Sequence, residues 1–156
     1  MCAAGYTCVG GNPYSCEKYC TATSQCIAPR GQCVIQLTDG TNPIPGAVVC
    51  SSNCDPSAAT NALCPTNWSC DLFTSMYNAT NYNIVDCRPN GTAGVNAACS
   101  TTVACAAGLT CVNNGTSNVC MTICNKTANT GCSGGKTCTG FATAFTVGGT
   151  EYGVCN

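Results

Sequence analysis

Apolar residues in this chain gather in short runs that favour β-strands, and no stretch sustains the 3.6-residue spacing of an amphipathic helix. Three segments between cysteines have the same length: Cys33 to Cys50, Cys70 to Cys87 and Cys138 to Cys155. In the third, "FATAFTVGGTEYGV", β-forming residues flank Gly148-Gly149, a strong signal for a two-residue hairpin turn. We expect the first to turn at Asp39-Gly40 and the second between Asn78 and Asn81. The pattern predicts an all-β chain of hairpins.

The cysteines repeat with the spacing C-x5–9-C-x5/6-C-x7–16-C. Four complete copies cover residues 20–50, 54–87, 99–120 and 124–155, which we call modules 2 to 5. The three remaining cysteines, Cys2, Cys8 and Cys16, form module 1 (residues 1–16), which lacks the first cysteine of the pattern. The heptapeptides "CAAGYTC" at 2–8 and "CAAGLTC" at 105–111 are nearly identical, which makes Cys8 the equivalent of Cys111, a third cysteine.

The spaces between modules predict how the chain is divided. Most modules are joined by three residues, whereas residues 88–98, "RPNGTAGVNAA", read as a linker rich in Pro, Gly and Asn. We therefore expect three modules in residues 1–87, this linker, and two modules in residues 99–156. The predicted architecture is small, disulfide-rich and all-β, with tandem four-cysteine modules laid end to end in an elongated array.

Composition explains why the modules need covalent support. The chain has 19 Cys among 156 residues, about 12%, whereas Leu, Ile, Val and Phe together make up about 15%. With few large aliphatic residues to fill a core, disulfides must supply much of the stability. Disulfides persist in oxidising compartments, so we expect an extracellular or cell-surface protein.

Charge and hydropathy exclude several partners. Five Lys or Arg against six Asp or Glu leave no basic surface for nucleic acid. No apolar run reaches the length of a membrane span. No signal peptide is recognisable, so we expect the numbered chain to be a mature or excised piece in which Met1 is not necessarily the initiator.

Candidate catalytic and metal chemistry finds little support in the sequence. The absence of histidine excludes triads that use imidazole, and the absence of C-x2-C argues against zinc knuckles and redox dithiols. The six acidic residues are scattered along the chain through different modules, which argues against a paired-carboxylate glycosidase. Trp68 and the six tyrosines are expected to pack against disulfides more than to form a sugar-stacking face. We therefore expect no enzyme, no cofactor and no metal.

The cysteine spacing alone leaves all three connectivities of a four-cysteine module open. The stretch "GVNAACSTTVACAAGLTCVNNGTSNVC" resembles the cysteine-rich module of the Dickkopf N-terminal and colipase-like group. The shared features are C-x5-C, a Gly-Leu-x-Cys segment and a cysteine after a short turn, and the resemblance covers mainly residues 99–155. Unlike colipase-like domains, this chain has no adjacent Cys-Cys pair.

The resemblance implies that the first cysteine of a module pairs with the third and the second with the fourth. Applied along the chain, it implies nine bridges: Cys2–Cys16, Cys20–Cys33, Cys26–Cys50, Cys54–Cys70, Cys64–Cys87, Cys99–Cys111, Cys105–Cys120, Cys124–Cys138 and Cys132–Cys155. Cys8 then has no partner in the numbered chain and is expected to be a free thiol or to pair between molecules.

Five N-x-S/T sequons are candidate glycosylation sites: Asn67, Asn78, Asn90, Asn114 and Asn125. We expect Asn78, Asn90 and Asn114 to be the most accessible, because they fall in turns or in the linker. Glycans there would supply the solubility that a charged fraction of 7% does not.

Two functions fit these features. The first is an extracellular structural protein, a glycosylated and disulfide-stapled subunit that forms a homopolymer in a filament, fibril or surface coat. In that polymer Cys8 would meet a cysteine of a neighbouring copy or of a preceding segment. The alternative is a secreted cysteine-rich binding module, a receptor ligand or an inhibitor, which would favour a hairpin with a distinctive charged or aromatic tip.

Overall fold

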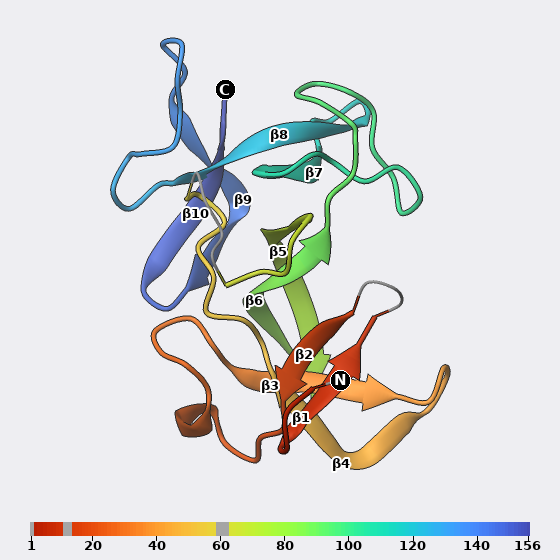
Figure 1. Ribbon diagram of the computed structural model, residues 1–156. Helices are drawn as coiled ribbons and strands as arrows, with labels where there is room; N and C mark the ends of the chain where they lie inside the picture. The colour runs from red at the N-terminus through yellow and green to blue at the C-terminus, as the bar shows by residue number, and fades with distance from the viewer. Residues whose placement is uncertain (1, 11–13, 59–62) are drawn as a thin grey trace.

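A computed structural model describes residues 2–10, 14–58 and 63–156, and within these ranges the chain forms β-hairpins and no α-helix (Figure 1). The elements in chain order are β1 (Tyr6–Val9), β2 (Ser15–Lys18), the 3₁₀ turn η1 (Thr23–Gln25), β3 (Cys33–Thr38), β4 (Pro43–Cys50), β5 (Trp68–Tyr77), β6 (Thr80–Pro89), β7 (Leu109–Asn113), β8 (Asn118–Asn125), β9 (Cys138–Val147) and β10 (Thr150–Cys155). Every strand pairing is antiparallel. The prediction of a small, disulfide-rich all-β protein is confirmed.

The three long segments between cysteines form the hairpins β3–β4, β5–β6 and β9–β10, as predicted. In β9–β10 the turn consists of Gly148 and Gly149, with φ of 57° and 80°, the left-handed backbone that two-residue hairpin turns require. In β5–β6 the same kind of turn is made by Asn78 (φ 49°) and Ala79 (φ 59°), so it is narrower than the expected span to Asn81. The β3–β4 turn contains Asp39, whose backbone N–H donates to the carbonyl of Asn42 at 3.0 Å.

Each hairpin places two cysteines directly opposite one another. The third and fourth cysteines of every module are paired across the strands: Cys8 with Cys16, Cys33 with Cys50, Cys70 with Cys87, Cys111 with Cys120 and Cys138 with Cys155. These opposite cysteines are not bonded to each other. In modules 2 to 5, each forms a bridge to a cysteine in the segment before the hairpin. The hairpin and two crosslinks therefore define one complete module.

Nine disulfides join the same cysteine pairs that the resemblance implies: Cys2–Cys16, Cys20–Cys33, Cys26–Cys50, Cys54–Cys70, Cys64–Cys87, Cys99–Cys111, Cys105–Cys120, Cys124–Cys138 and Cys132–Cys155. All nine lie within modules and none joins two modules. Their buried sulfurs form much of the packed interior, which divides into three clusters among the described residues rather than one shared aliphatic core.

Modules 4 and 5 share one sheet. The expected three-residue join between them, Met121–Ile123, lies inside β8, which pairs with β7 of module 4 on one side and β10 of module 5 on the other. The resulting sheet has the order β7-β8-β10-β9. A continuous strand therefore replaces the expected short connection and fixes the two modules relative to each other.

The chain also folds back on itself, so the modules do not follow one another in a line. Tyr152, Val147 and Ile123 of the C-terminal sheet pack into one cluster with Cys70 and Val85 of module 3, and β6 contacts β9 (Figure 1). The accessible surface is 8592 Å², compared with about 7,300 Å² for a compact monomer of this mass. The accessible surface is therefore larger than that of a compact monomer, although modules distant in sequence pack against each other.

Residues 88–98 are held against module 4 by hydrogen bonds. The Gly91 N–H donates to the Cys105 carbonyl at 2.9 Å, and Ala93 exchanges backbone hydrogen bonds with Ala104 and Ala106. A Cβ at Gly91 would lie 1.8 Å from the Ala104 carbonyl oxygen, so only glycine fits this approach. Arg88 donates to the Cys105 and Leu109 carbonyls and pairs with Asp71, which ties β5 and β6 to module 4.

Candidate functional site

The β1–β2 hairpin of module 1 has one buried face and one exposed face. Because side chains alternate along a strand, Ser15 and Glu17 are buried, while Cys8 and Cys16 point to the exposed face. Tyr6 and Lys18 are opposite each other and share that face, and Tyr6 is 42% exposed. The sequence pattern of this hairpin therefore brings its cysteines to the surface, unlike the buried Cys70 and Cys120 of later modules.

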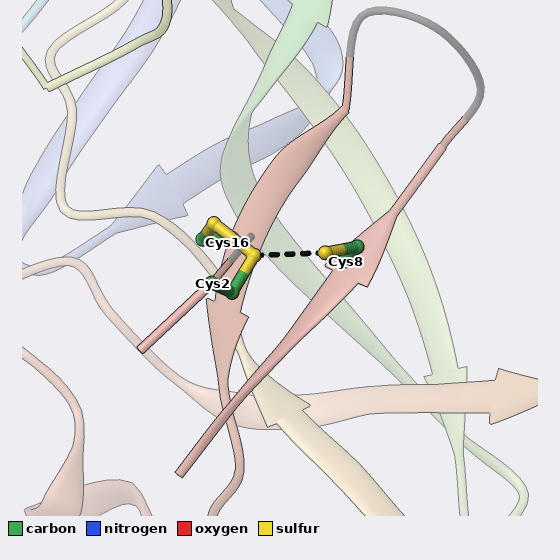
Figure 2. A group of neighbouring side chains, drawn as sticks. All are labelled: Cys2, Cys8 and Cys16. Atoms are coloured by element: carbon green, nitrogen blue, oxygen red, sulfur yellow. Dashed lines mark hydrogen bonds between the residues drawn. A yellow bond between two sulfur atoms is a disulfide. The ribbon is translucent and has the colours of Figure 1, made fainter. Parts of the chain in front are cut away.

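Cys8 is the one cysteine without a bridge in the described part of the chain, which contains all 19 cysteines. Its Sγ lies 3.0 Å from the Sγ of Cys2, and the Sγ atoms of Cys2, Cys8 and Cys16 all lie within 4.8 Å of one another. Figure 2 shows the Cys8 sulfur pointing at the Cys2 end of the Cys2–Cys16 disulfide. We call these three residues the three-cysteine cluster.

Comparison with the complete modules explains why Cys8 is unpaired. In module 4, Cys111 occupies the same place in the repeated heptapeptide and is bonded to Cys99, the first cysteine of its module. In module 2 the third cysteine, Cys33, is likewise bonded to the first, Cys20. Cys8 therefore stands at a position where the fold normally forms a crosslink, and module 1 contains no residue that completes it.

The three-cysteine cluster has limited capacity as a metal site while its bridge is intact. Metal binding by cysteine uses thiolates, and only Cys8 can supply one when Cys2 and Cys16 are bonded to each other. Reduction of that bridge would present three thiolates. The oxidised cluster is suited instead to forming or exchanging a disulfide.

Two carboxylic acids, the buried Glu17 and the half-buried Asp86, lie behind the first hairpin, and nothing in the sequence pattern indicates that they are close. Glu17 is 8% exposed and accepts a hydrogen bond from the Ser15 hydroxyl at 2.7 Å; burial and the nearby Asp86 charge raise the pKa of Glu17 to about 7. Asp86 accepts a hydrogen bond from Ser52 at 2.7 Å, and burial also raises its pKa. The charges of Glu17 on β2 and Asp86 in module 3 therefore interact, because the first hairpin and module 3 line the same cavity.

A cavity of about 400 Å³ adjoins this pair. Its lining includes Glu17, Asp86 and Arg88 together with the apolar side chains of Trp68 and Phe73. The indole N–H of Trp68 is buried and has no hydrogen-bond partner among the described residues. The expectation that the tyrosines pack against disulfides holds for some of them. Tyr152 and Tyr77 pack into clusters that contain disulfides, whereas Tyr6, Tyr14 and Tyr19 are exposed.

Four of the five sequon asparagines are exposed. They are Asn67 before β5, Asn78 in the β5–β6 turn, Asn90 after β6 and Asn114 in the β7–β8 turn. Asn125 is half-buried at the end of β8, and its side-chain oxygen accepts a hydrogen bond from the Ala128 N–H at 2.9 Å. The three sites favoured by the sequence, Asn78, Asn90 and Asn114, are thus accessible to a modifying enzyme.

No helix in the described ranges has the length and apolar character needed to cross a membrane. Comparisons with protein-family models, with curated proteins and with solved structures find no match to this chain. The density of disulfides is typical of extracellular proteins. The function must therefore be inferred from the geometry of the site itself.

Proposed function

We propose that this protein is an extracellular structural subunit that associates with further copies of itself and forms one covalent bond per chain through Cys8. The observation that carries this proposal is the exposed Cys8 thiol, which stands at the position where every complete module has a bridge. An unpaired cysteine in an oxidising compartment favours an intermolecular disulfide. The proposed role requires no cofactor, metal or catalytic group.

The surface around the three-cysteine cluster supports association. Cys16 lines a hollow whose border includes Tyr6, Ile27 and Leu63, and these apolar residues are 42%, 65% and 58% exposed. Exposed apolar residues that gather around one hollow favour contact with another molecule. A second copy that bonds to Cys8 would cover part of this surface.

The number of thiols limits the covalent product. With one thiol per chain, oxidation joins Cys8 of one copy to Cys8 of another and stops at a covalent pair. The resulting interface is two-fold, because the same surface meets itself. A longer filament would then need a second, non-covalent contact between pairs, so the polymer would be built from covalent pairs.

The proposal is tested by electrophoresis of native material, alkylated at once on extraction, with and without a reductant. We expect a species of twice the 15.7 kDa of one chain that returns to monomer mass on reduction. The Cys8→Ser variant should give only the monomer mass. Native material that is monomeric in mass, with a labelled Cys8 thiol, would contradict the covalent part of the proposal.

Glycans belong to the same proposal. The asparagines Asn78, Asn90 and Asn114 lie on turns or on the segment after β6, and all three are exposed. A source that modifies asparagine would add mass at these three sites before Asn125. Intact mass equal to the bare polypeptide would remove glycosylation from the proposal without affecting Cys8.

The alternative function, a secreted binding module, is favoured by the cavity near Trp68. Tryptophan fluorescence gives a direct readout, because Trp68 is the single tryptophan of the chain. A ligand that shifts this emission without changing the covalent pair would favour the binding function.

A further inference from the structure

Cys8 lies close enough to an existing disulfide to react with it. Its Sγ is 3.0 Å from the Sγ of Cys2, which is bonded to Cys16. In Figure 2 the Cys8 sulfur approaches the Cys2 sulfur while the Cys16 sulfur lies beyond it, the order that displacement at Cys2 requires. Thiol–disulfide exchange proceeds by attack of a thiolate on one sulfur with release of the other, and it depends on access.

The neighbouring backbone permits both bonding states. Cys8 and Cys16 are directly opposite on β1 and β2, and both are exposed, so the half-buried Cys2 lies next to either one. Residue 2 precedes the Ala3–Tyr6 turn, in which the Tyr6 N–H donates to the Ala3 carbonyl at 3.1 Å. Moving the bridge from Cys16 to Cys8 therefore changes a crosslink within module 1 and does not require another module to open.

We propose that the three-cysteine cluster is a thiol–disulfide exchange site in which the free thiol is shared between Cys8 and Cys16. The Cys8 thiolate attacks the Cys2 sulfur, a Cys2–Cys8 bond forms, the Cys2–Cys16 bond breaks, and Cys16 leaves as the thiolate. One disulfide is lost and one gained, and one thiolate is consumed and one released, so no oxidant is needed. Bonding to a second copy is a separate step, which rests on the proposed function above: the exposed thiol joins the thiol of that copy, and an extracellular oxidant such as dioxygen accepts the two electrons and two protons.

The exchange gives the cluster a second cysteine that can carry the reactive thiol. In one bonding state the reactive thiol is Cys8 on β1, and in the other it is Cys16 on β2, beside the hollow bordered by Ile27 and Leu63. A partner could therefore be bonded through either strand. Module 4 provides an internal contrast: its equivalent of Cys8, Cys111, is held by Cys99, so its repeated heptapeptide has no thiol to exchange.

The test is alkylation of the wild-type chain, purified without reductant and kept dilute as the monomer. The protein is held at pH 8.5, treated with iodoacetamide at several concentrations, quenched in acid and mapped by mass spectrometry without reduction. We expect molecules labelled on Cys8 that retain Cys2–Cys16 and molecules labelled on Cys16 that contain Cys2–Cys8, with never both labels together. The fraction of molecules labelled on Cys16 should fall as the iodoacetamide concentration rises, because alkylation of the Cys8 thiol then becomes faster than exchange. Label on Cys8 alone at every concentration would overturn the proposal.

Two variants make the result specific. Cys16→Ser should lose its reactive thiol altogether, because Cys2 and Cys8 are left to bond to each other, whereas persistence of both as thiols would contradict the exchange. Cys99→Ser recreates the open position in module 4, but there the thiol released would be Cys120, which is fully buried. That control should be labelled on Cys111 and not on Cys120. It shows whether the cysteine that leaves the disulfide must be exposed for its thiol to be labelled.

The outcome is independent of the proposed function. If wild type is labelled only on Cys8 yet still forms covalent pairs that Cys8→Ser abolishes, exchange is wrong and the structural role stands. If both cysteines are labelled but native material contains no covalent pair, the exchange site stands and the proposed association through Cys8 is wrong.

Discussion

Ala79 adopts a backbone conformation that suits glycine better. It is the second residue of the β5–β6 turn and has φ of 59°, whereas the equivalent position in the β9–β10 turn is Gly149. A left-handed conformation costs a residue with a Cβ about 1–2 kcal/mol, while glycine costs about 0.5–1 kcal/mol in lost backbone freedom. The two effects oppose each other, and the first is larger.

We therefore predict that Ala79→Gly raises the free energy of unfolding by about 0.5–1 kcal/mol. The measurement is denaturant unfolding under non-reducing conditions. Ala142→Gly is the matched control, because Ala142 is exposed in the extended strand β9 and should lose stability instead. If both variants lose stability alike, turn strain at Ala79 is not significant.

Glu17 makes the stability of the protein depend on pH. Its pKa is about 7 in the folded chain against 4.5 for an ordinary glutamate, so the folded state binds more protons than the unfolded state between those values. Stability is then greatest below pH 4.5 with respect to this group and falls as pH rises toward about 7. The raised pKa of Asp86 acts in the same direction.

The prediction is a lower melting temperature at pH 8 than at pH 5, measured by calorimetry without reductant. Glu17→Gln removes the titrating group while keeping a side chain of similar size, and should flatten most of this difference. A wild-type melting temperature that rises across the range would show that the pKa of Glu17 is not raised in the folded chain.

The sequence indicates a turn at Gly148-Gly149 because glycine adopts, without a Cβ clash, the left-handed backbone that a two-residue hairpin turn requires. It could not find the electrostatic interaction of Glu17 with Asp86, since it depends on how the first hairpin is placed against module 3. Spacing along the chain describes modules one at a time. The spacing therefore does not indicate which acidic residues of two modules lie close together in the folded chain.

At the scale of the element, the segment from Asn90 to Ala98 behaves as part of module 4. Composition rich in Gly, Asn and Pro suggested a linker, and composition does not reveal that Gly91 and Ala93 hydrogen-bond to the chain at residues 104–106. The join at Met121–Ile123 differs for the same reason. Three residues between cysteines look like a connection, but β8 extends through them because strands on both sides accept its hydrogen bonds.

This docking predicts a sharp difference between two glycines of the segment. Gly91→Ala should lower the free energy of unfolding by about 1–3 kcal/mol, because the added Cβ would meet the Ala104 carbonyl. Gly94→Ala should change little, since no atom lies within 4 Å of the place that an added methyl group would occupy and its φ is not left-handed. Both are measured by denaturant unfolding, and equal effects would mean that the segment is not held against module 4.

At the scale of the whole molecule, modules distant in sequence are joined by a small polar network. The Arg30 Nε–H donates to the Tyr152 hydroxyl at 2.7 Å, and the Arg30 guanidinium pairs with Asp55 at 2.6 Å. These contacts connect modules 2, 3 and 5. The sequence predicted the modules and their hairpins, but a repeat of cysteines does not say whether successive modules extend or fold back.

Tyr152→Phe tests this packing. Loss of the hydroxyl removes the hydrogen bond from Arg30 and should cost about 1 kcal/mol of the free energy of unfolding. Amide hydrogen exchange should also speed up at Arg30 and Gly31 more than in β7, which lies in module 4. Tyr6→Phe, on the exposed face of the first hairpin, is the control and should leave both readouts unchanged. Equal exchange in wild type and Tyr152→Phe would indicate that module 5 does not rest on module 2.

The central claim is that Cys8 is an open crosslinking position through which two copies are bonded. The most direct measurement is the intact mass of native material, alkylated on extraction and analysed without reduction, beside the same material reduced. The account predicts a covalent pair of twice the 15.7 kDa chain mass, plus any glycans, that separates on reduction and is missing from Cys8→Ser. A monomer mass before reduction, with the alkyl group on Cys8 or Cys16, would contradict it.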